Sequence, residues 1–282
     1  MTIRQHLQKA QERLIQSQSA RLDAQLLLCR VLGVEKSYLV AHDDRLLTDE
    51  EAAHYADLLA RRQQGEPIAY ILGTRGFYDL EFVVTPAVLI PRPETEHLIE
   101  AALEWSQDRQ KLTAADIGTG SGAIAVTFAR HRPQAEVHAV DISNDALAIA
   151  QKNARNNRAA VHFHQGNLAQ PLIDAGIRID LLMANLPYIR QGEIPDLAVS
   201  KHEPLLALDG GEDGLDLVRE LLRQVPLVCA ADGLILLEIG AEQGLAVLEA
   251  TRIILPTASA AILKDYAGQD RIIRIERSST KP

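Results

Sequence analysis

Residues 113–122 read TAADIGTGSG, an apolar strand pattern that runs straight into three alternating glycines. Glycine adopts positive φ easily and has no side chain, so a loop of this kind turns sharply and lets a ligand approach its backbone. A tight connection between a strand and a helix would also explain Gly118, Gly120 and Gly122. The acid Asp116 before the glycines and the apolar helical pattern after them favour a nucleotide-type binding loop.

Helical and strand patterns alternate from residue 94 to the C-terminus. The expected helices cover residues 94–106, 122–131, 144–157, 214–230 and 242–253, and the expected strands cover 112–117, 136–141, 160–165, 179–184, 233–239, 259–264 and 270–276. This alternation predicts an α/β fold with a mostly parallel sheet covered by helices on both faces. Ligands of such sheets bind beyond the carboxyl ends of the strands, so chemistry is expected in the loops there.

Residues 2–64 contain only helical patterns. One apolar stripe covers residues 3–14, and a second covers residues 22–32. Thr48 with Glu51 three positions later forms a capping-box signature before a third helix. The region has equal numbers of acidic and basic residues. It predicts a small neutral helical bundle, for which a docking module and a stabilising appendage are equally open interpretations.

The stretch between these regions changes character. Short strand patterns at residues 68–72, 82–84 and 88–90 alternate with glycine and proline breaks. Pro91-Arg92-Pro93 cannot lie inside a helix and leads into one at Glu94. The expected organisation is a helical bundle over 1–64, a β-hairpin linker over 65–92 and an α/β domain over 93–282.

Composition narrows the class of protein. The 282 residues are 47% hydrophobic and 24% charged, which is typical of a globular chain. The net charge of −9 argues against a protein that grips nucleic acid mainly through phosphates. Two distant cysteines, Cys29 and Cys229, exclude a disulfide scaffold and favour a reducing compartment. Without a membrane-length apolar run or a signal-peptide core, the expected location is the cytoplasm.

Two further loops follow expected strands. Asp141 ends the strand after the glycine loop, where an acid can accept hydrogen bonds from both ribose hydroxyls of a bound nucleoside. The alternative role for Asp141 is the N-cap of the next helix, which Ser143 or Asn144 would also fill. The glycine loop and this acid fit a nicotinamide dinucleotide and S-adenosylmethionine equally well.

The loop Asn185-Leu186-Pro187-Tyr188 separates those two possibilities. It resembles the Asn-Pro-Pro-Tyr motif of class I S-adenosylmethionine-dependent methyltransferases that modify planar amino nitrogens. An amide nitrogen is a poor nucleophile because its lone pair is delocalised. Two oxygen acceptors can orient its N–H groups and aim the lone-pair face at the methyl group, and proximity and alignment of this kind can supply several kcal/mol.

The resemblance narrows to the protein-(glutamine-N5) methyltransferases that act on peptide-chain release factors. It rests on residues 65–73, Leu89 to Glu96, the glycine loop, Glu203-Pro204 and Leu237 to Gly240, and it covers nearly the whole chain. It implies a Rossmann-like domain that methylates the glutamine of a Gly-Gly-Gln loop on class I release factors. It also implies a release-factor docking role for the N-terminal bundle.

The same resemblance assigns roles to individual residues. Asn185, Pro187 and Tyr188 are expected to be catalytic, and Leu186 joins them in binding the glutamine through its backbone carbonyl. S-adenosylmethionine is expected to contact Arg92, Pro93, Thr95, Gly118, Thr119, Gly120, Ser121, Gly122, Asp141, Asn167, Leu168 and Asn185. Leu186 stands where the family usually has proline, and Asn167-Leu168 where relatives often have an acid and an aromatic residue.

Other interpretations remain at this point. The same tetrapeptide could act on adenine N6 or guanine N2 in nucleic acid, on a flipped base. A nicotinamide-dependent oxidoreductase would give Asn185 to Tyr188 no role, and a binding-only relative is suggested only by Leu186. His162 and His164 lack partners at metal-ligand spacing, so no metal is expected. Lys201-His202-Glu203 is interpreted as a solvated or partner-facing patch, and the protein is expected to be a monomer that binds no nucleic acid directly.

Overall fold

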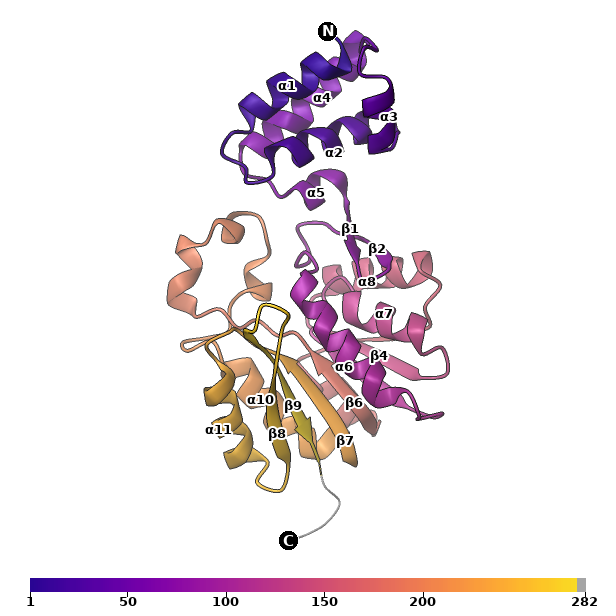
Figure 1. Cartoon of the computed structure of the whole chain (residues 1–282). Coiled ribbons are helices and arrows are strands. Elements are labelled where there is room, and N and C mark those ends of the chain that lie inside the picture. Colours follow the sequence, from indigo (N-terminus) through magenta and orange to yellow (C-terminus); the bar gives the residue numbers. More distant parts are fainter. Residues whose placement is uncertain (278–282) are drawn as a thin grey trace. The chain divides into compact units, whose positions relative to one another are not determined.

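The computed structural model describes residues 1–277, except for the side chains of residues 198 and 199. The chain forms two compact units, Met1–Thr74 and Arg75–Pro282 (Figure 1). Each unit has its own hydrophobic core. In residues 1–277 no helix is both long enough and apolar enough to span a bilayer.

The first unit consists of five helices, with one isolated β-bridge between Thr2 and Leu46 and with Thr74, its last residue, beginning strand β1 (Thr74–Phe77). Its helices are α1 (Ile3–Arg13), α2 (Ala20–Leu32), α3 (Lys36–Ala41), α4 (Asp49–Gln63) and α5 (Ile68–Leu72). The predicted capping box is confirmed, because the Thr48 hydroxyl accepts from the Glu51 N–H at 3.2 Å and the Glu51 carboxylate accepts from the Thr48 N–H at 2.9 Å. Buried Tyr55 donates to the Ala24 carbonyl at 3.0 Å and joins α4 to α2. The short helix α3 is absent from the sequence-based prediction.

The strand predicted at residues 68–72 is wrong, because this segment is helix α5. Pro67 sets up its start, and Gly73 ends it with a φ of 79°. Ile68, Ile71 and Leu72 then lie on one side and pack on the core of the first unit. A five-residue apolar run has no clear period, so local pattern alone could not decide between helix and strand.

A two-stranded hairpin opens the second unit. It consists of β1 (Thr74–Phe77) and β2 (Leu80–Val83), which confirms the predicted hairpin. Phe77 and Phe82 are buried with their rings edge to face. The Asn153 side chain accepts from the Val83 N–H at 2.7 Å and donates to the Val83 carbonyl at 2.9 Å, which holds the hairpin against α8 (Asn144–Asn156). The strand predicted at residues 88–90 is wrong, since that segment is irregular.

The main sheet has seven strands in the order β5-β4-β3-β6-β7-β9-β8. The strands are β3 (Thr113–Ile117), β4 (Glu136–Asp141), β5 (His162–Gln165), β6 (Ile179–Ala184), β7 (Cys229–Glu238), β8 (Ser259–Lys264) and β9 (Asp270–Glu276). The first five in spatial order are parallel, and β9 pairs antiparallel with both β7 and β8. The strand order reverses between β3 and β6, so a ligand crevice is expected beyond their carboxyl ends.

Helices cover both faces of this sheet, as predicted. Leu181 and Met183 of β6 pack in the cluster that contains α6 (Glu96–Ser106) and α7 (Ala123–His131). Leu182 and Ala184 point the other way, into the cluster that contains α10 (Asp216–Val228) and α11 (Gly244–Ile254). This two-residue alternation is what a strand buried on both faces requires.

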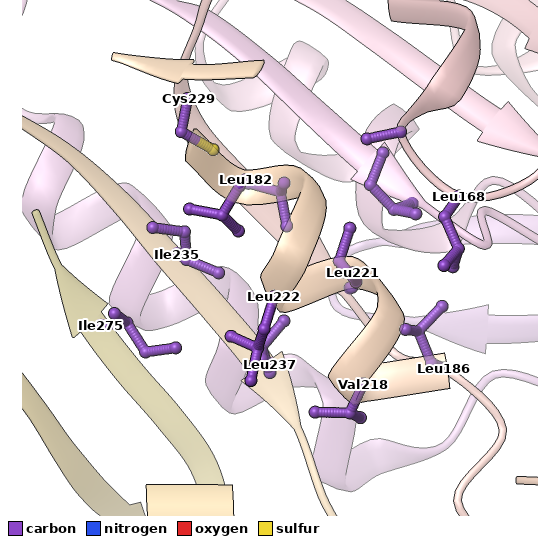
Figure 2. Close-up of a cluster of buried hydrophobic side chains, with 14 of the residues drawn as sticks. Leu168, Leu182, Leu186, Val218, Leu221, Leu222, Cys229, Ile235, Leu237 and Ile275 are labelled. Carbon is purple, nitrogen blue, oxygen red and sulfur yellow. The ribbon is translucent and has the colours of Figure 1, made fainter. Parts of the chain in front are cut away.

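Figure 2 shows the second of these clusters, with Leu182, Ile235 and Leu237 of the sheet beside Val218 and Leu222 of α10. The remaining short helices are α9 (Gln170–Asp174), η1 (Pro93–Thr95), η2 (Gln191–Asp196), η3 (Ala198–Lys201) and η4 (Leu205–Ala207). Most of them belong to loops at the carboxyl edge of the sheet.

Candidate functional site

A cavity of about 210 Å³ opens at the carboxyl edge of the sheet in the second unit. Its wall includes most of the residues predicted from the sequence, namely Arg92, Thr95, Gly118, Thr119, Gly120, Ser121, Asp141, Asn167, Leu168, Asn185, Leu186 and Pro187. Pro93, Gly122 and Tyr188 lie outside the lining. Loops that follow four different strands therefore meet at one cavity.

The glycine loop is built for close backbone contact. Gly118, Gly120 and Gly122 have φ values of 75°, 54° and 82°, a region that side chains disfavour. The N–H groups of Gly118 and Thr119 donate to the Val140 carbonyl at 2.9 and 3.0 Å. A Cβ on Gly122 would lie 3.1 Å from the Ala150 Cβ, so this glycine permits close packing of α7 on α8.

Asp116 anchors the loop from beneath. Its carboxylate accepts from the Thr119 hydroxyl at 2.6 Å and from the Ala125 N–H at 3.1 Å. Complete burial raises the pKa of Asp116 to about 7, against the two hydrogen bonds, which lower it. Its other oxygen has no partner within residues 1–277. The acid thus ties the first turn of α7 to the glycine loop.

Asp141 faces the same cavity from the end of β4. Its carboxylate accepts from the Gly120 N–H at 2.8 Å and from the Ser143 N–H at 2.9 Å. Burial raises the pKa of Asp141, and these backbone donors oppose that shift. The Ser143 hydroxyl accepts from the Ala146 N–H at 3.2 Å and caps α8. The alternative N-cap role for Asp141 is therefore excluded.

The far wall of the cavity is largely apolar. Leu168 is buried and has a φ of 48°, an uncommon conformation for a branched residue. Asn167 lines the cavity, and its amide donates to the Glu220 carboxylate at 2.7 Å. Ile142 also lines it with 52% of its surface exposed. Ile142 was not among the residues predicted for the site, although its place directly after the strand-ending Asp141 is a usable signal.

The tetrapeptide leaves β6 at the centre of the cavity wall. The Asn185 amide Nδ2 donates to the Thr95 hydroxyl at 3.1 Å. Leu186 is buried, and its Cδ2 would lie 3.1 Å from a Cβ on Gly118, so the two loops touch. Figure 2 shows Leu186 and Leu168 at the edge of the core cluster. The loop of residues 185–188, called the acceptor loop below, is therefore packed directly against the glycine loop.

The turn at residues 210–214 packs against the tetrapeptide from outside the cavity. A Cβ on Gly210 would lie 2.8 Å from the Pro187 carbonyl oxygen, and one on Gly214 would clash with the Tyr188 carbonyl oxygen. The Gln243 amide donates to that same Tyr188 carbonyl at 2.9 Å. Side chains at these glycines would displace the tetrapeptide. Sequence patterns could not reveal this contact because it joins segments distant in the chain.

Tyr188 lies beside the cavity, outside its lining. Burial raises the pKa of the Tyr188 phenol, with a further rise from the Glu238 carboxylate. Arg271 and Arg92 lower it, and Glu94 raises it. The ring is thus surrounded by charged groups from β7, β9 and the segment before α6.

Arg92 and Glu203 form an ion pair that joins two walls. The guanidinium Nη2 donates to both carboxylate oxygens at 2.7 Å. Burial raises the pKa of Glu203, and Arg92 lowers it. Glu203 is 4% exposed, so the prediction that Lys201 to Glu203 form a solvated or partner-facing patch is wrong for this residue. The pair fixes the segment around η4 next to the cavity.

Three histidines cluster on the edge of the sheet. His138 Nδ1 lies 3.0 Å from His164 Nε2, and the His138 ring lies 5.2 Å from those of His162 and His164. Burial and neighbouring histidines lower the pKa of His138 and His164. Over the described residues, no group of three or more His, Cys, Asp or Glu side chains could hold a metal ion.

This cluster predicts an acid-dependent loss of stability. When the folded-state pKa lies below the ordinary value of 6.5, the unfolded chain takes up the proton first as the pH falls. The contribution of His138 to the free energy of unfolding should therefore decrease from about pH 7 down through its folded-state pKa, and the difference between wild type and a His138 variant isolates it from the buried carboxyls, whose raised pKa values act in the opposite direction. Urea titrations from pH 8 to pH 5 check this, comparing wild type with His138→Gln. The variant should lose less free energy of unfolding on acidification than wild type does. His54→Gln, which changes an exposed side chain on α4, should behave as wild type.

Comparisons with known proteins agree over nearly the whole chain. The PrmC N-terminal domain family matches residues 5–73, and the Methyltransferase small domain family matches residues 95–202. The release factor glutamine methyltransferase of Moorella thermoacetica is 42% identical over 276 residues, covering 96% of this chain and 97% of that protein. The enzyme of the same name from Vibrio cholerae is 40% identical, covering 96% of each. A solved methyltransferase from Pyrococcus furiosus has a TM-score of 0.52 at 19% identity, covering 78% of this chain and 98% of that one, which shows a shared fold.

Proposed function

The chain belongs to the release factor glutamine methyltransferase family, and from this premise we propose how its own residues carry out the reaction. It methylates the side-chain amide nitrogen, N5, of a release-factor glutamine, which is the function that the sequence resemblance implied. One observation supports the assignment of the reaction to these residues, namely the contact between two loops that line the cavity. The acceptor loop at Asn185 and the glycine loop at Gly118 line one cavity and touch through Leu186.

The cavity fits S-adenosylmethionine, the methyl donor of this family. The donor supplies an electrophilic methyl group bound to a sulfonium sulfur. Asp141 keeps carboxylate lone pairs available for the ribose hydroxyls, and Ile142 and Leu168 offer apolar surface for the adenine. The backbone of residues 118–121 and the segment from Arg92 to Thr95 would hold the methionine portion. Asn167 would pair with the adenine edge.

The glutamine amide would be held by two carbonyl acceptors. Asn185 Nδ2 already donates to Thr95, so the Asn185 Oδ1 is left to accept an N–H from the substrate. The Leu186 carbonyl would accept the second N–H, and Pro187 restricts Leu186 to an extended backbone. Tyr188 would pack on the planar amide from beside the cavity. We assign no general base, because an amide N–H becomes strongly acidic once its nitrogen carries the positive charge.

The decisive assay uses labelled S-adenosylmethionine with a class I release factor. Methyl transfer to the intact factor, and loss of transfer when the glutamine of its Gly-Gly-Gln loop becomes alanine, would support the proposal. Bulk RNA and DNA serve as competing acceptors. Labelling of nucleic acid with none on the release factor would overturn the proposal and favour the adenine or guanine amino methyltransferase interpretation.

The helical unit is proposed to dock the release factor. Its core shares no residue with the cavity lining, and its helices, two of which begin with a capping box, form one compact unit that could bind a protein partner. We further propose that the enzyme acts as a monomer in the cytoplasm and recognises the release factor without nucleic acid. The net charge of −9 agrees with a protein partner more than with phosphate binding.

Removing the helical unit should separate docking from chemistry. A chain that begins at Arg75 is expected to lose about 100-fold or more in kcat/KM on an intact release factor, because a second binding contact raises the effective concentration of the first. Its kcat/KM on a short Gly-Gly-Gln peptide should stay near that of the full chain. Steady-state kinetics on both substrates make the comparison. Equal losses on peptide and protein would show that the unit stabilises the enzyme and does not dock the substrate.

A further inference from the structure

Glu238 is a buried carboxylate beside the acceptor loop with no assigned role. The register of β6 and β7 aligns Ala184 with Leu237, so Asn185 and Glu238 both follow directly from paired residues. Glu238 is 2% exposed. A lone carboxylate is costly to bury, so its position at the site calls for partners that use it.

Two side chains of the site are those partners. Burial raises the pKa of Glu238, and the neighbouring side chains of Thr95 and Asn185 both lower it. The Asn185 Nδ2 also donates to the Thr95 hydroxyl at 3.1 Å. Glu238 Oε2 has no hydrogen-bond partner in the part of the chain described here, so the carboxylate keeps spare acceptor capacity. Thr95 and Asn185 line the cavity, and Glu238 lies behind them at the end of the paired strand β7.

The charges around Glu238 come from several elements. Arg271 of β9 lowers its pKa, and Glu94 of η1 raises it. Burial raises the pKa of the Tyr188 phenol in the tetrapeptide, and the Glu238 charge raises it further. Burial is the largest influence and raises the pKa of Glu238 to about 7. The carboxylate therefore titrates near neutral pH.

The chemistry of this network fixes the direction of the Asn185 amide. An amide presents a donor end and an acceptor end, and packing alone hardly distinguishes them. An ionised carboxylate only accepts hydrogen bonds, so it holds the Nδ2 end toward itself and Thr95. The Oδ1 end then faces the cavity. A protonated or neutral group at this position could donate, and it would allow the amide to turn.

We propose that Glu238 is a positioning residue for methyl transfer, which acts by orienting the Asn185 amide so that its Oδ1 accepts the substrate N–H. The inference rests on the proposed function of Asn185 and deepens it. Glu238 itself touches neither reactant. Its contribution should therefore appear in turnover and vanish when Asn185 is removed.

The test compares Glu238→Gln with wild type in full-length protein on an intact release factor. Turnover at saturating substrates is expected to fall on the order of 10- to 100-fold, because misorienting a positioning group by about 1 Å can cost 10²-fold. The dissociation constant for S-adenosylmethionine and the KM for the release factor should change by less than about threefold. Glu238→Asp keeps an acceptor-only group and should retain more turnover than Glu238→Gln. Glu276→Gln, an exposed change on β9, is the matched control and should behave as wild type.

A double-mutant cycle separates orientation from a structural role. In an Asn185→Ala background, Glu238→Gln should cause no further loss of turnover, since the group that it orients is gone. The pH profile gives an independent readout. Wild-type turnover should rise with pH through an apparent pKa near 7, and this limb should disappear in Glu238→Gln.

The possible results distinguish a failure of the role proposed for Glu238 from a failure of the proposed function. If wild type does not methylate the release factor, the proposed function fails. If wild type is active but Glu238→Gln keeps turnover within twofold, or loses the same factor with and without Asn185, the inference is overturned while the function stands. If Glu238→Gln does not fold, the same cycle with Glu238→Asp decides, and additive losses again overturn the inference.

Discussion

Replacing Asn185 with alanine is expected to lower turnover by about 10²- to 10³-fold while leaving cofactor affinity nearly unchanged. Deleting a single preorganised group that hydrogen-bonds the reacting centre typically has this effect on rate. Here the lost group is the Oδ1 acceptor that would orient the glutamine amide. Asn185 Nδ2 donates to the Thr95 hydroxyl and also interacts with the Glu238 carboxylate, and both are side-chain contacts at the site, so the fold should tolerate the change.

Two measurements check this expectation. Single-turnover methylation of a release factor gives the rate, and calorimetric titration with S-adenosylmethionine gives the affinity. Asn156→Ala, an exposed position on α8, is the matched control and should keep the wild-type rate. A variant that turns over normally but binds cofactor weakly would contradict the orienting role and make Asn185 a cofactor residue.

The α/β domain was predictable because its signals are local and repeat many times. Strands such as β6 show continuous apolar runs, and the helices between them show a 3.6-residue period, so the predicted and observed bounds differ by only a few residues. The loops at the ends of β3, β4 and β6 could then be placed at one edge by topology alone. The cavity lining joins these loops, as that placement requires.

The errors have a common physical cause. Residues 68–72 and 88–90 are short apolar segments whose conformation is set by tertiary packing, so their composition favoured strands that do not form. The prediction that Glu203 is solvated or partner-facing is wrong because its partner Arg92, which lies 111 positions away in the sequence, allows this charged side chain to be buried. A contact between distant segments leaves no periodic trace.

Glu238 illustrates the same limit within the site. Its place at the end of an apolar strand was visible, and the resemblance even included it among matching positions. Its proximity to Asn185 depends on the pairing of β6 with β7, which the sequence does not state. Similarly, Gly122 belongs to the glycine pattern and was predicted to contact the cofactor. It lies outside the cavity lining and packs against Ala150, where it allows α7 to approach α8 closely.

Replacing Asp141 with alanine should have the opposite signature to Asn185→Ala. The dissociation constant for S-adenosylmethionine is expected to rise about 100-fold, because two hydrogen bonds to a charged acceptor contribute roughly 1.5 kcal/mol or more each. The glycine loop would also lose the acceptor for the Gly120 N–H. Turnover at saturating cofactor should stay within severalfold of wild type, since the proposed partner of Asp141 is the ribose and not the transferred methyl group.

Titration of cofactor binding and kinetics at saturating cofactor measure the two effects separately. Asp141→Asn keeps one carbonyl acceptor and should fall between wild type and the alanine variant. Asp145→Ala, an exposed acid in the first turn of α8, tests whether loss of negative charge near the site is enough, and it should change the affinity little. Asp141→Ala should also leave α8 intact by far-ultraviolet circular dichroism, because Ser143 caps that helix. If the affinity for S-adenosylmethionine stays unchanged while turnover collapses, the Asp141 carboxylate acts in the reaction and does not bind the ribose. The assignment of cofactor binding to the loop after β4 and of substrate orientation to the loop after β6 would then be wrong.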